Sequence, residues 1–381
     1  MKICAVICEY NPFHNGHLYQ LHEAKKHSQA DALLCIMSGN FVQRGEAAIV
    51  DKFTRAKHAV LGGADAVIEL PAIFATSNAE LFAKGAISIL SSIPDVTTLC
   101  FGAETANADA FVQTAKLMNH EPESISTAIK AYTAQGMSFA KARMTAWQEM
   151  VNVDLLSSPN NILGLEYTRA ILERNATIEI LPIQRMGGGY HDTTLDCEFS
   201  SASAIRAGLA NGFDISTAAP NFVQEDLNVQ PTQDLDTLEK YAILTRKPEN
   251  IARVCDCTEG LENAFKKAAT QPQTLEKSLT SARYTSSRIR RIALQNLLGI
   301  DEHLIRAGLQ SPLFLRVLAV KKERSDILSA LSASPCPTII RAHDEDILCG
   351  VAKDVYQRDI FAENVYTLLQ NPQKQRNIFI P

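Results

Sequence analysis

Four apolar segments recur along the first hundred residues, at 2–8, 30–37, 64–70 and 96–102. Each is continuous and rich in β-branched or cysteine side chains, which is typical of strands buried on both faces of a sheet. The intervening stretches carry apolar residues at helical spacing, over 14–28, 50–63 and 78–93. This alternation predicts an α/β fold with a parallel, doubly wound sheet of Rossmann type, whose ligands bind at the carboxyl ends of the strands.

The sequence after residue 105 predicts further helices and one more strand. Residues 106–172 have a helical pattern and indicate an insertion, and residues 177–185 predict a returning strand. Next we expect a flexible loop at 187–192, a serine-capped helix at 200–212 and a linker or long surface connection at 219–236. From about residue 237 the pattern is mainly helical. We therefore expect a catalytic domain over 1–215 and a mainly α-helical domain over 216–381.

The first candidate site directly follows the first predicted strand and opens a helix, at residues 9–17. The free N–H groups of a helix N-terminus favour phosphate. His14 and His17 lie on one face of the first turn, where they could stabilise charge on a departing pyrophosphate. Gly16 would leave room for a purine or a phosphate, and Pro12 stiffens the entry. A solvated surface pair or half of a metal site remains the alternative, although no third ligand has a characteristic spacing.

Other familiar nucleotide motifs are missing. Neither GxxxxGK[ST] nor GxGxxG follows a predicted strand. Among later segments, Gly102 ends the fourth predicted strand, Arg185 ends the strand over 177–185, and Ser203 and Arg206 belong to the helix over 200–212. A turn glycine, a surface arginine and a capped helix are the alternatives at these places. Arg44 follows the second strand, and we assign it no role.

His14-Asn15-Gly16-His17 matches the (H/T)xGH motif of nucleotidyltransferases and class I aminoacyl-tRNA synthetases. The longer strings EYNPFHNGH and MSGNFVQRGEAAIVDKFTRAKHAVLGGADAVIELP make the chain similar to the tRNA(Met) cytidine acetate ligase family. The similarity extends over essentially the whole chain and is strongest in residues 5–105 and 157–206. Residues 201–206 resemble a late SSTxIR signature, with Ala202 and Ser203 where Ser-Thr is frequent.

The resemblance implies a two-step reaction, in which ATP activates acetate as acetyl-adenylate and the acetyl group passes to the exocyclic amine of the wobble cytidine of elongator tRNA(Met), giving N4-acetylcytidine. It implies His14 and His17 as catalytic residues, with Mg²⁺ accompanying the ATP. It also implies an ATP site made of Ile7, Cys8, Glu9, Tyr10, Asn11, Pro12, Phe13, His14, Asn15, Gly16, His17, Leu18, Tyr19, Gln20, Gly102, Asn161, Arg185, Ser203 and Arg206. Acetate is already ionised at pH 7, so the first step needs no general base, and no carboxylate pair stands out.

RNA binding is predicted at residues 281–291, which contain Arg283, Arg288, Arg290 and Arg291 and no acid. Ile289, Ile292, Ala293 and Leu297 form an inward stripe, which leaves Arg288, Arg291 and Gln295 on another face. A solvated helix is the alternative on these residues alone. A family that acts on tRNA favours an anticodon-arm contact.

Composition narrows the class of protein. The chain has 381 residues and a formal net charge of −5, which neither indicates nor excludes a local RNA-binding patch. No apolar stretch approaches the roughly 20 residues that cross a bilayer, and no signal-peptide pattern begins the sequence, so we expect a cytoplasmic protein. Nine scattered cysteines without CxxC spacing argue against a disulfide framework or a zinc ribbon, and we predict no metal-ligating set.

Two other functions remain open at this point. One is a nucleotidyltransferase of cofactor biosynthesis, against which the long helical C-terminal half counts. The other is a non-catalytic RNA-binding protein with the same fold, against which the intact His14, Gly16, His17 and Arg206 count.

Overall fold

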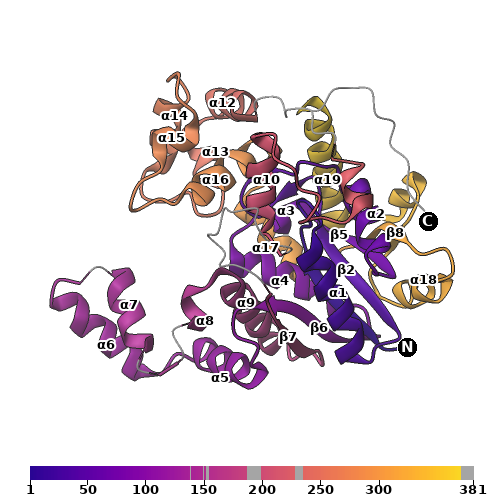
Figure 1. Cartoon of the computed structure of the whole chain (residues 1–381). Helices are drawn as coiled ribbons and strands as arrows, with labels where there is room; N and C mark the ends of the chain where they lie inside the picture. The colour runs from indigo at the N-terminus through magenta and orange to yellow at the C-terminus, as the bar shows by residue number, and fades with distance from the viewer. Residues whose placement is uncertain (138, 149, 152–153, 187–198, 228–234, 370–381) are drawn as a thin grey trace.

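The computed structural model describes residues 1–137, 139–148, 150–151, 154–186, 199–227 and 235–369, and the loop expected at 187–192 lies outside them. Its centre is a seven-stranded sheet with the strand order β7-β6-β1-β2-β5-β8-β9 (Figure 1). The strands are β1 (Ile3–Cys8), β2 (Ala32–Ser38), β5 (Ala66–Leu70), β6 (Val96–Ala103), β7 (Glu179–Gln184), β8 (Leu315–Val320) and β9 (Thr338–Ile339). Neighbours among β1, β2, β5, β6 and β7 are parallel. The α/β fold and all five predicted strands are thus confirmed.

The helices between these strands cover both faces of the sheet, so that every residue of β1, β2 and β5 is buried. They are α1 (Asn15–Ser28), α2 (Lys52–Leu61), α3 (Ala72–Ala75) and α4 (Ala79–Leu90). Local side chains start several of them: Asp51 accepts from the first amides of α2, and Asn78 caps α4. A small hairpin of β3 (Phe41–Val42) and β4 (Glu46–Ala47) follows β2.

The predicted helical insertion is present between β6 and β7. It consists of α5 (Ala108–Asn119), α6 (Glu123–Ala134), α7 (Phe139–Gln148), α8 (Asp154–Ser157) and α9 (Pro159–Glu173). Helices α6 and α7 extend away from the sheet in Figure 1 and bury a small core of their own around Ile129 and Trp147. Helix α9 packs on α4, α5 and β6, which brings its N-terminus to the carboxyl end of β6.

The second half of the chain is mainly helical, as predicted. After α10 (Ala202–Ala210) and α11 (Asn221–Gln224), the described part of the chain resumes in a group of helices that we call the helical module. The module comprises α12 (Leu235–Thr245), α13 (Pro248–Ile251), α14 (Leu261–Ala268), α15 (Leu275–Leu279) and α16 (Ser286–Leu298). It has its own hydrophobic core, which includes Ile243, Phe265 and Ile292.

Two features of this half differ from the expectation. The segment expected as a linker packs onto the core up to residue 227: Val223 is fully buried, and Asp226 accepts from Lys57 and His58. Beyond the module the chain returns to the sheet, because β8 pairs antiparallel with β5. The central sheet therefore contains strands from both sides of residue 215. The division into two domains at that residue stays a prediction.

The returning segment comprises α17 (Glu302–Gln310), β8, α18 (Ser325–Ser332), β9, a 3₁₀ helix (Ala342–Ile347) and α19 (Gly350–Leu369). Buried charges hold it: Arg316 of β8 contacts Glu69 and Glu363, and Lys52 contacts the same two carboxylates. Because a buried charge is tolerated only when it is paired, this network explains an arginine inside a strand. The same arginine interrupts the apolar run 313–320, and the hydrophobic pattern therefore did not predict this strand.

Candidate nucleotide site

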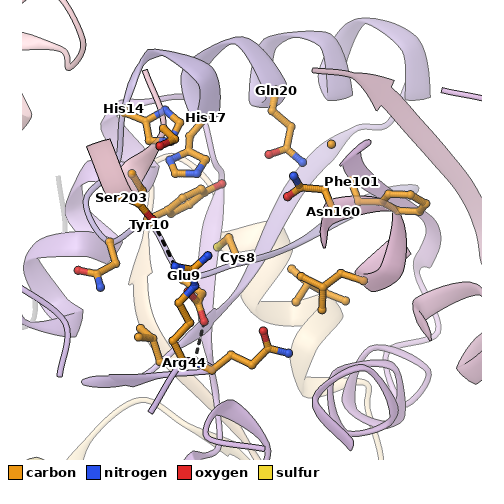
Figure 2. A pocket seen from close by; sticks show the side chains of 18 of the residues that line it. Cys8, Glu9, Tyr10, His14, His17, Gln20, Arg44, Phe101, Asn160 and Ser203 are labelled. Atoms are coloured by element: carbon orange, nitrogen blue, oxygen red, sulfur yellow. Dashed lines mark hydrogen bonds between the residues drawn. The ribbon is translucent and has the colours of Figure 1, made fainter. Parts of the chain in front are cut away.

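A cavity of about 220 Å³ opens at the carboxyl ends of β1 and β6, where the fold class predicts a ligand (Figure 2). The N-termini of α1, α9 and α10 converge on it, and the β3–β4 hairpin covers one side. Of the predicted ATP-binding residues, those that line it are Ile7, Cys8, Glu9, Tyr10, Asn11, His14, His17, Gln20, Gly102, Arg185, Ser203 and Arg206. Segments far apart in the sequence therefore meet at one place.

The two histidines of the motif lie against each other, with ring centroids 3.7 Å apart. His14 caps α1, because the amide of Gly16 donates to its Nδ1 at 3.0 Å. An accepting Nδ1 leaves Nε2–H as the donor of the neutral ring. Nδ1 of His17 is buried and has no hydrogen-bond partner within the described part of the chain. Both rings line the cavity, where phosphate oxygens could be bound.

Burial sets the charge state of this pair. It lowers the pKa of His14 to about 3, with Arg185 contributing a smaller effect of the same sign. The pKa of His17 is also lowered, first by burial and then by the charges of His14 and Arg185. Both rings are therefore neutral at pH 7, and they act as hydrogen-bonding dipoles and not as cations.

The protein itself requires a glycine at position 16, because a Cβ there would lie 2.9 Å from Cε1 of His14. The approach of a ligand to this backbone stays a prediction. At Gly102, in contrast, a Cβ would make an ordinary 3.5 Å contact with Cγ of Arg185. The protein therefore tolerates a methyl group at Gly102, and any requirement for glycine there would come from the ligand.

Three arginines line the cavity, and two of them, Arg44 and Arg206, lie together beside the start of α10. Arg206 donates to the carbonyl of Asn11 at 2.7 Å, and Arg44 and Arg206 both approach the hydroxyl of Ser203, at 3.5 Å and 3.4 Å. Arg185 lies near Glu104, 4.0 Å away. The concentration of guanidinium groups next to the start of α10 suits a polyphosphate. Arg44, to which the sequence assigned no role, is one of them.

Two carboxylates face the same cavity: Glu9, which the resemblance implied, and Glu46, which the sequence did not indicate. The amide of Gln43 donates to Glu9 at 2.8 Å, and burial raises the pKa of Glu9 despite the neighbouring arginines. Glu46 lies between Arg206 and Arg290, at 3.8 Å and 3.1 Å. Within the described ranges, no group of three His, Cys, Asp or Glu side chains could hold a metal ion.

The side chain of Asn161, which was predicted to contact the nucleotide, does not line the cavity. It is fully buried and accepts from the amides of Glu104 and Thr105, and so ties the start of α9 to the end of β6. The neighbouring Asn160 lines the cavity and donates to Glu104 at 2.6 Å. Asn160 and Asn161 are adjacent in α9, and only the rotation of the helix decides which of the two side chains faces the cavity. The sequence alone could not distinguish them. The prediction that Asn161 contacts the nucleotide therefore has no support from its side chain.

Several residues that were predicted to bind ATP lie outside the lining of this cavity. Phe13 is fully buried in the core, Asn15 donates to the carbonyl of Thr217, and Leu18 is exposed. Pro12 is buried beside the motif, while Gly16 and Tyr19 border a smaller adjoining cavity. Further residues, which the sequence did not indicate, line the main cavity from the hairpin, α4, β6 and α9, and they are Val42, Gln43, Phe82, Phe101, Leu163 and Tyr167. Aromatic and aliphatic positions in helices give no sequence signal of a ligand.

The arginines of α16 are less free than expected. Arg288 donates to the carbonyl of Asp256 at 2.7 Å, Arg291 approaches the carboxylate of Asp256 at 3.6 Å, and Arg290 contacts Glu46 and Glu276. Ile289, Ile292 and Ala293 are buried as predicted. Gln295 was expected on an outer face, but it is 2% exposed and donates to the carbonyl of Thr76.

Arg283 remains largely exposed, although it pairs with Glu259 at 2.6 Å. RNA binding through these four arginines stays a prediction. Of the four, Arg283 is the one that is largely exposed, whereas Arg288 also donates to the hydroxyl of Thr258.

A stacked His-x-x-His pair at the start of the first helix, opposite a serine–arginine helix N-terminus, defines a nucleotidyltransferase of the HIGH type. The family model described as HIGH Nucleotidyl Transferase matches residues 1–378. A tRNA(Met) cytidine acetate ligase of Thermoanaerobacter sp. (strain X514) is 36% identical, over 97% of this chain and 95% of that protein. Its counterpart from Halothermothrix orenii is 34% identical, over 99% and 97%.

A solved structure supports the same assignment. The crystal structure of Thermotoga maritima TmcAL bound with alpha-thio ATP has a TM-score of 0.86 and 28% identity, and the match covers 99% of this chain and 97% of that one. The chain belongs to the tRNA(Met) cytidine acetate ligase family. Membership in this family does not favour a cofactor-synthesis enzyme or a non-catalytic binding protein. In the parts of the chain that the structure describes, no helix is long and apolar enough to cross a membrane.

Proposed function

We propose that this protein activates acetate with ATP and transfers the acetyl group to the exocyclic amine of the wobble cytidine in elongator tRNA(Met). The observation that carries the proposal is the stacked pair of neutral histidines, which shares one cavity with Arg206 and Ser203. The related proteins carry this activity in their names, and the Thermotoga maritima structure holds an ATP analogue.

In the first step an acetate oxygen attacks the α-phosphate of ATP and pyrophosphate leaves. Negative charge increases on the departing phosphates, so hydrogen bonds from His14 and His17 and the charges of Arg206 and Arg185 stabilise the transition state more than the ground state. Acetate needs no deprotonation at pH 7, so neutral, low-pKa histidines suit this step. Mg²⁺ bound to the phosphates would neutralise further charge.

In the second step the cytidine amine attacks the acyl carbon and AMP leaves. This amine is a weak nucleophile, because its lone pair is delocalised into the ring. Acetyl-adenylate is a mixed anhydride, and it compensates for the weak nucleophile because AMP is a good leaving group.

The test is a labelling experiment with the purified protein, ATP, Mg²⁺, labelled acetate and bulk bacterial tRNA. Label should enter RNA, reside on cytidine after digestion and be accompanied by AMP and not ADP. Acetyl-CoA without ATP should not replace acetate. Label on a small metabolite, or transfer from acetyl-CoA alone, would refute the proposal.

A further inference from the structure

A second cavity, of about 440 Å³, lies beside the nucleotide cavity and shares two of its lining side chains, Glu46 and Arg206. One wall is the β3–β4 hairpin, and the opposite wall is the helical module, through α12, α15 and α16. The two cavities therefore meet at a carboxylate and a guanidinium. Arg44 and Arg206, which both approach the hydroxyl of Ser203, lie at this junction.

The β3–β4 hairpin and α16 pack closely where the two cavities meet. Arg290 reaches across this junction to Glu46 at 3.1 Å and donates from Nε to the carbonyl of Arg44 at 3.1 Å. Gly45, at the tip of the hairpin with φ 72°, packs so closely on α16 that a Cβ would lie 2.5 Å from the amide nitrogen of Arg291. The hairpin and the module thus fix each other, and the second cavity has defined walls.

The chemistry of these walls suits a flat base better than an anion. Ala47, Leu275 and Ile289 supply apolar surface, whereas Glu276 and Glu46 supply acceptors and Arg290 a donor. Carboxylates repel phosphate, but they accept well from an exocyclic amine such as that of cytosine. A guanidinium can donate to the ring nitrogen and carbonyl of the same base.

We propose that the second cavity receives the acceptor base, an amine-bearing pyrimidine, and that Glu46 accepts the proton that its amine releases. This inference rests on the proposed function. The amine nitrogen forms a bond to the acyl carbon, and the bond from that carbon to the phosphate oxygen breaks, so AMP leaves with the electron pair. The nitrogen becomes positive as its bond forms and gives one proton to the Glu46 carboxylate, which later releases it to solvent.

The first test fills the second cavity alone. Ala47 borders the second cavity but not the first, so Ala47→Phe should occupy the base site and spare the nucleotide site. Acetate-dependent ATP–pyrophosphate exchange, measured without RNA, should stay within about twofold of wild type, and acetyl transfer to tRNA should fall at least tenfold. Ala134→Phe, on the exposed end of α6, is the matched control and should change neither.

The second test separates the proton acceptor from the ion pair. Glu46 and Glu276 both contact Arg290, at 3.1 Å and 3.0 Å, but only Glu46 also borders the nucleotide cavity. Glu46→Gln should reduce transfer at least tenfold more than exchange and should alter the acidic limb of the pH profile for transfer. Glu276→Gln, which removes an acceptor of the second cavity but not the proton acceptor, should leave exchange within about twofold of wild type and reduce transfer less than Glu46→Gln does.

The outcomes distinguish this inference from the function on which it rests. If the wild-type protein does not label RNA at all, the proposed function fails. If wild type transfers the acetyl group and folded Ala47→Phe transfers it equally well, only the assignment of the second cavity is overturned. Equal losses of exchange and transfer in Glu46→Gln would overturn the role of Glu46 as proton acceptor.

Discussion

The burial of His14 makes the stability of the protein depend on pH, and the effect can be isolated in one variant. We choose His14→Asn, because asparagine can still accept from the amide of Gly16 and cap α1. The variant therefore removes the imidazole without leaving the helix uncapped.

The magnitude follows from the difference between the folded and unfolded pKa. The pKa of His14 falls from an ordinary value of 6.5 to about 3, mainly through burial. Between pH 7 and pH 5 the folded ring stays neutral, while the ring of the unfolded chain gains a proton. Protonation thus stabilises only the unfolded state, so stability is present above about pH 6.5 and is lost as the pH falls. At pH 5 the loss from this one residue is about 2 kcal/mol, from 1.36 kcal/mol per pKa unit over about 1.5 units.

Urea unfolding at pH 7 and pH 5 measures this difference. Wild type should lose about 2 kcal/mol more of its unfolding free energy than His14→Asn between the two pH values, with similar m-values. If both proteins lose the same free energy, His14 is not buried as a neutral ring and its assigned charge state is wrong. A variant that is less stable at pH 7 does not affect this comparison, because each protein is compared with itself.

Two further predictions concern the reaction and the RNA. His17→Ala should fold and lose acetate-dependent ATP–pyrophosphate exchange by roughly 100-fold or more, as expected for a donor used in the transition state, and exchange at the wild-type rate would exclude that role. Arg283→Glu should weaken tRNA binding in filter assays and lower its salt dependence by about one phosphate contact, whereas Glu259→Gln, which removes the partner of Arg283, should leave affinity equal or higher. Unchanged affinity in Arg283→Glu would identify the segment before α16 as ordinary surface.

The position of the nucleotide site was accessible from the sequence, because its signals are local. A continuous apolar strand followed by His14 and His17 specifies both the element and the place of the histidines at its carboxyl end. The serine cap before Ala202 likewise predicts the helix that presents Ser203 and Arg206. Caps, strand runs and helix starts involve residues within a few positions of each other, so a linear pattern contains them.

The tertiary structure decided what depends on residues distant in the chain. The rotation of α9 places Asn160 and not Asn161 at the cavity, and the hairpin brings Glu46 to Arg290, one of the predicted RNA contacts. Burial by several elements made the histidines neutral. Paired charges let Arg316 lie within a strand of the central sheet. The local sequence pattern determined which helices and strands form and where the catalytic motif lies. Desolvation and charge pairing exist only once the chain has folded. They therefore determine which side chains are neutral, paired or available to a ligand.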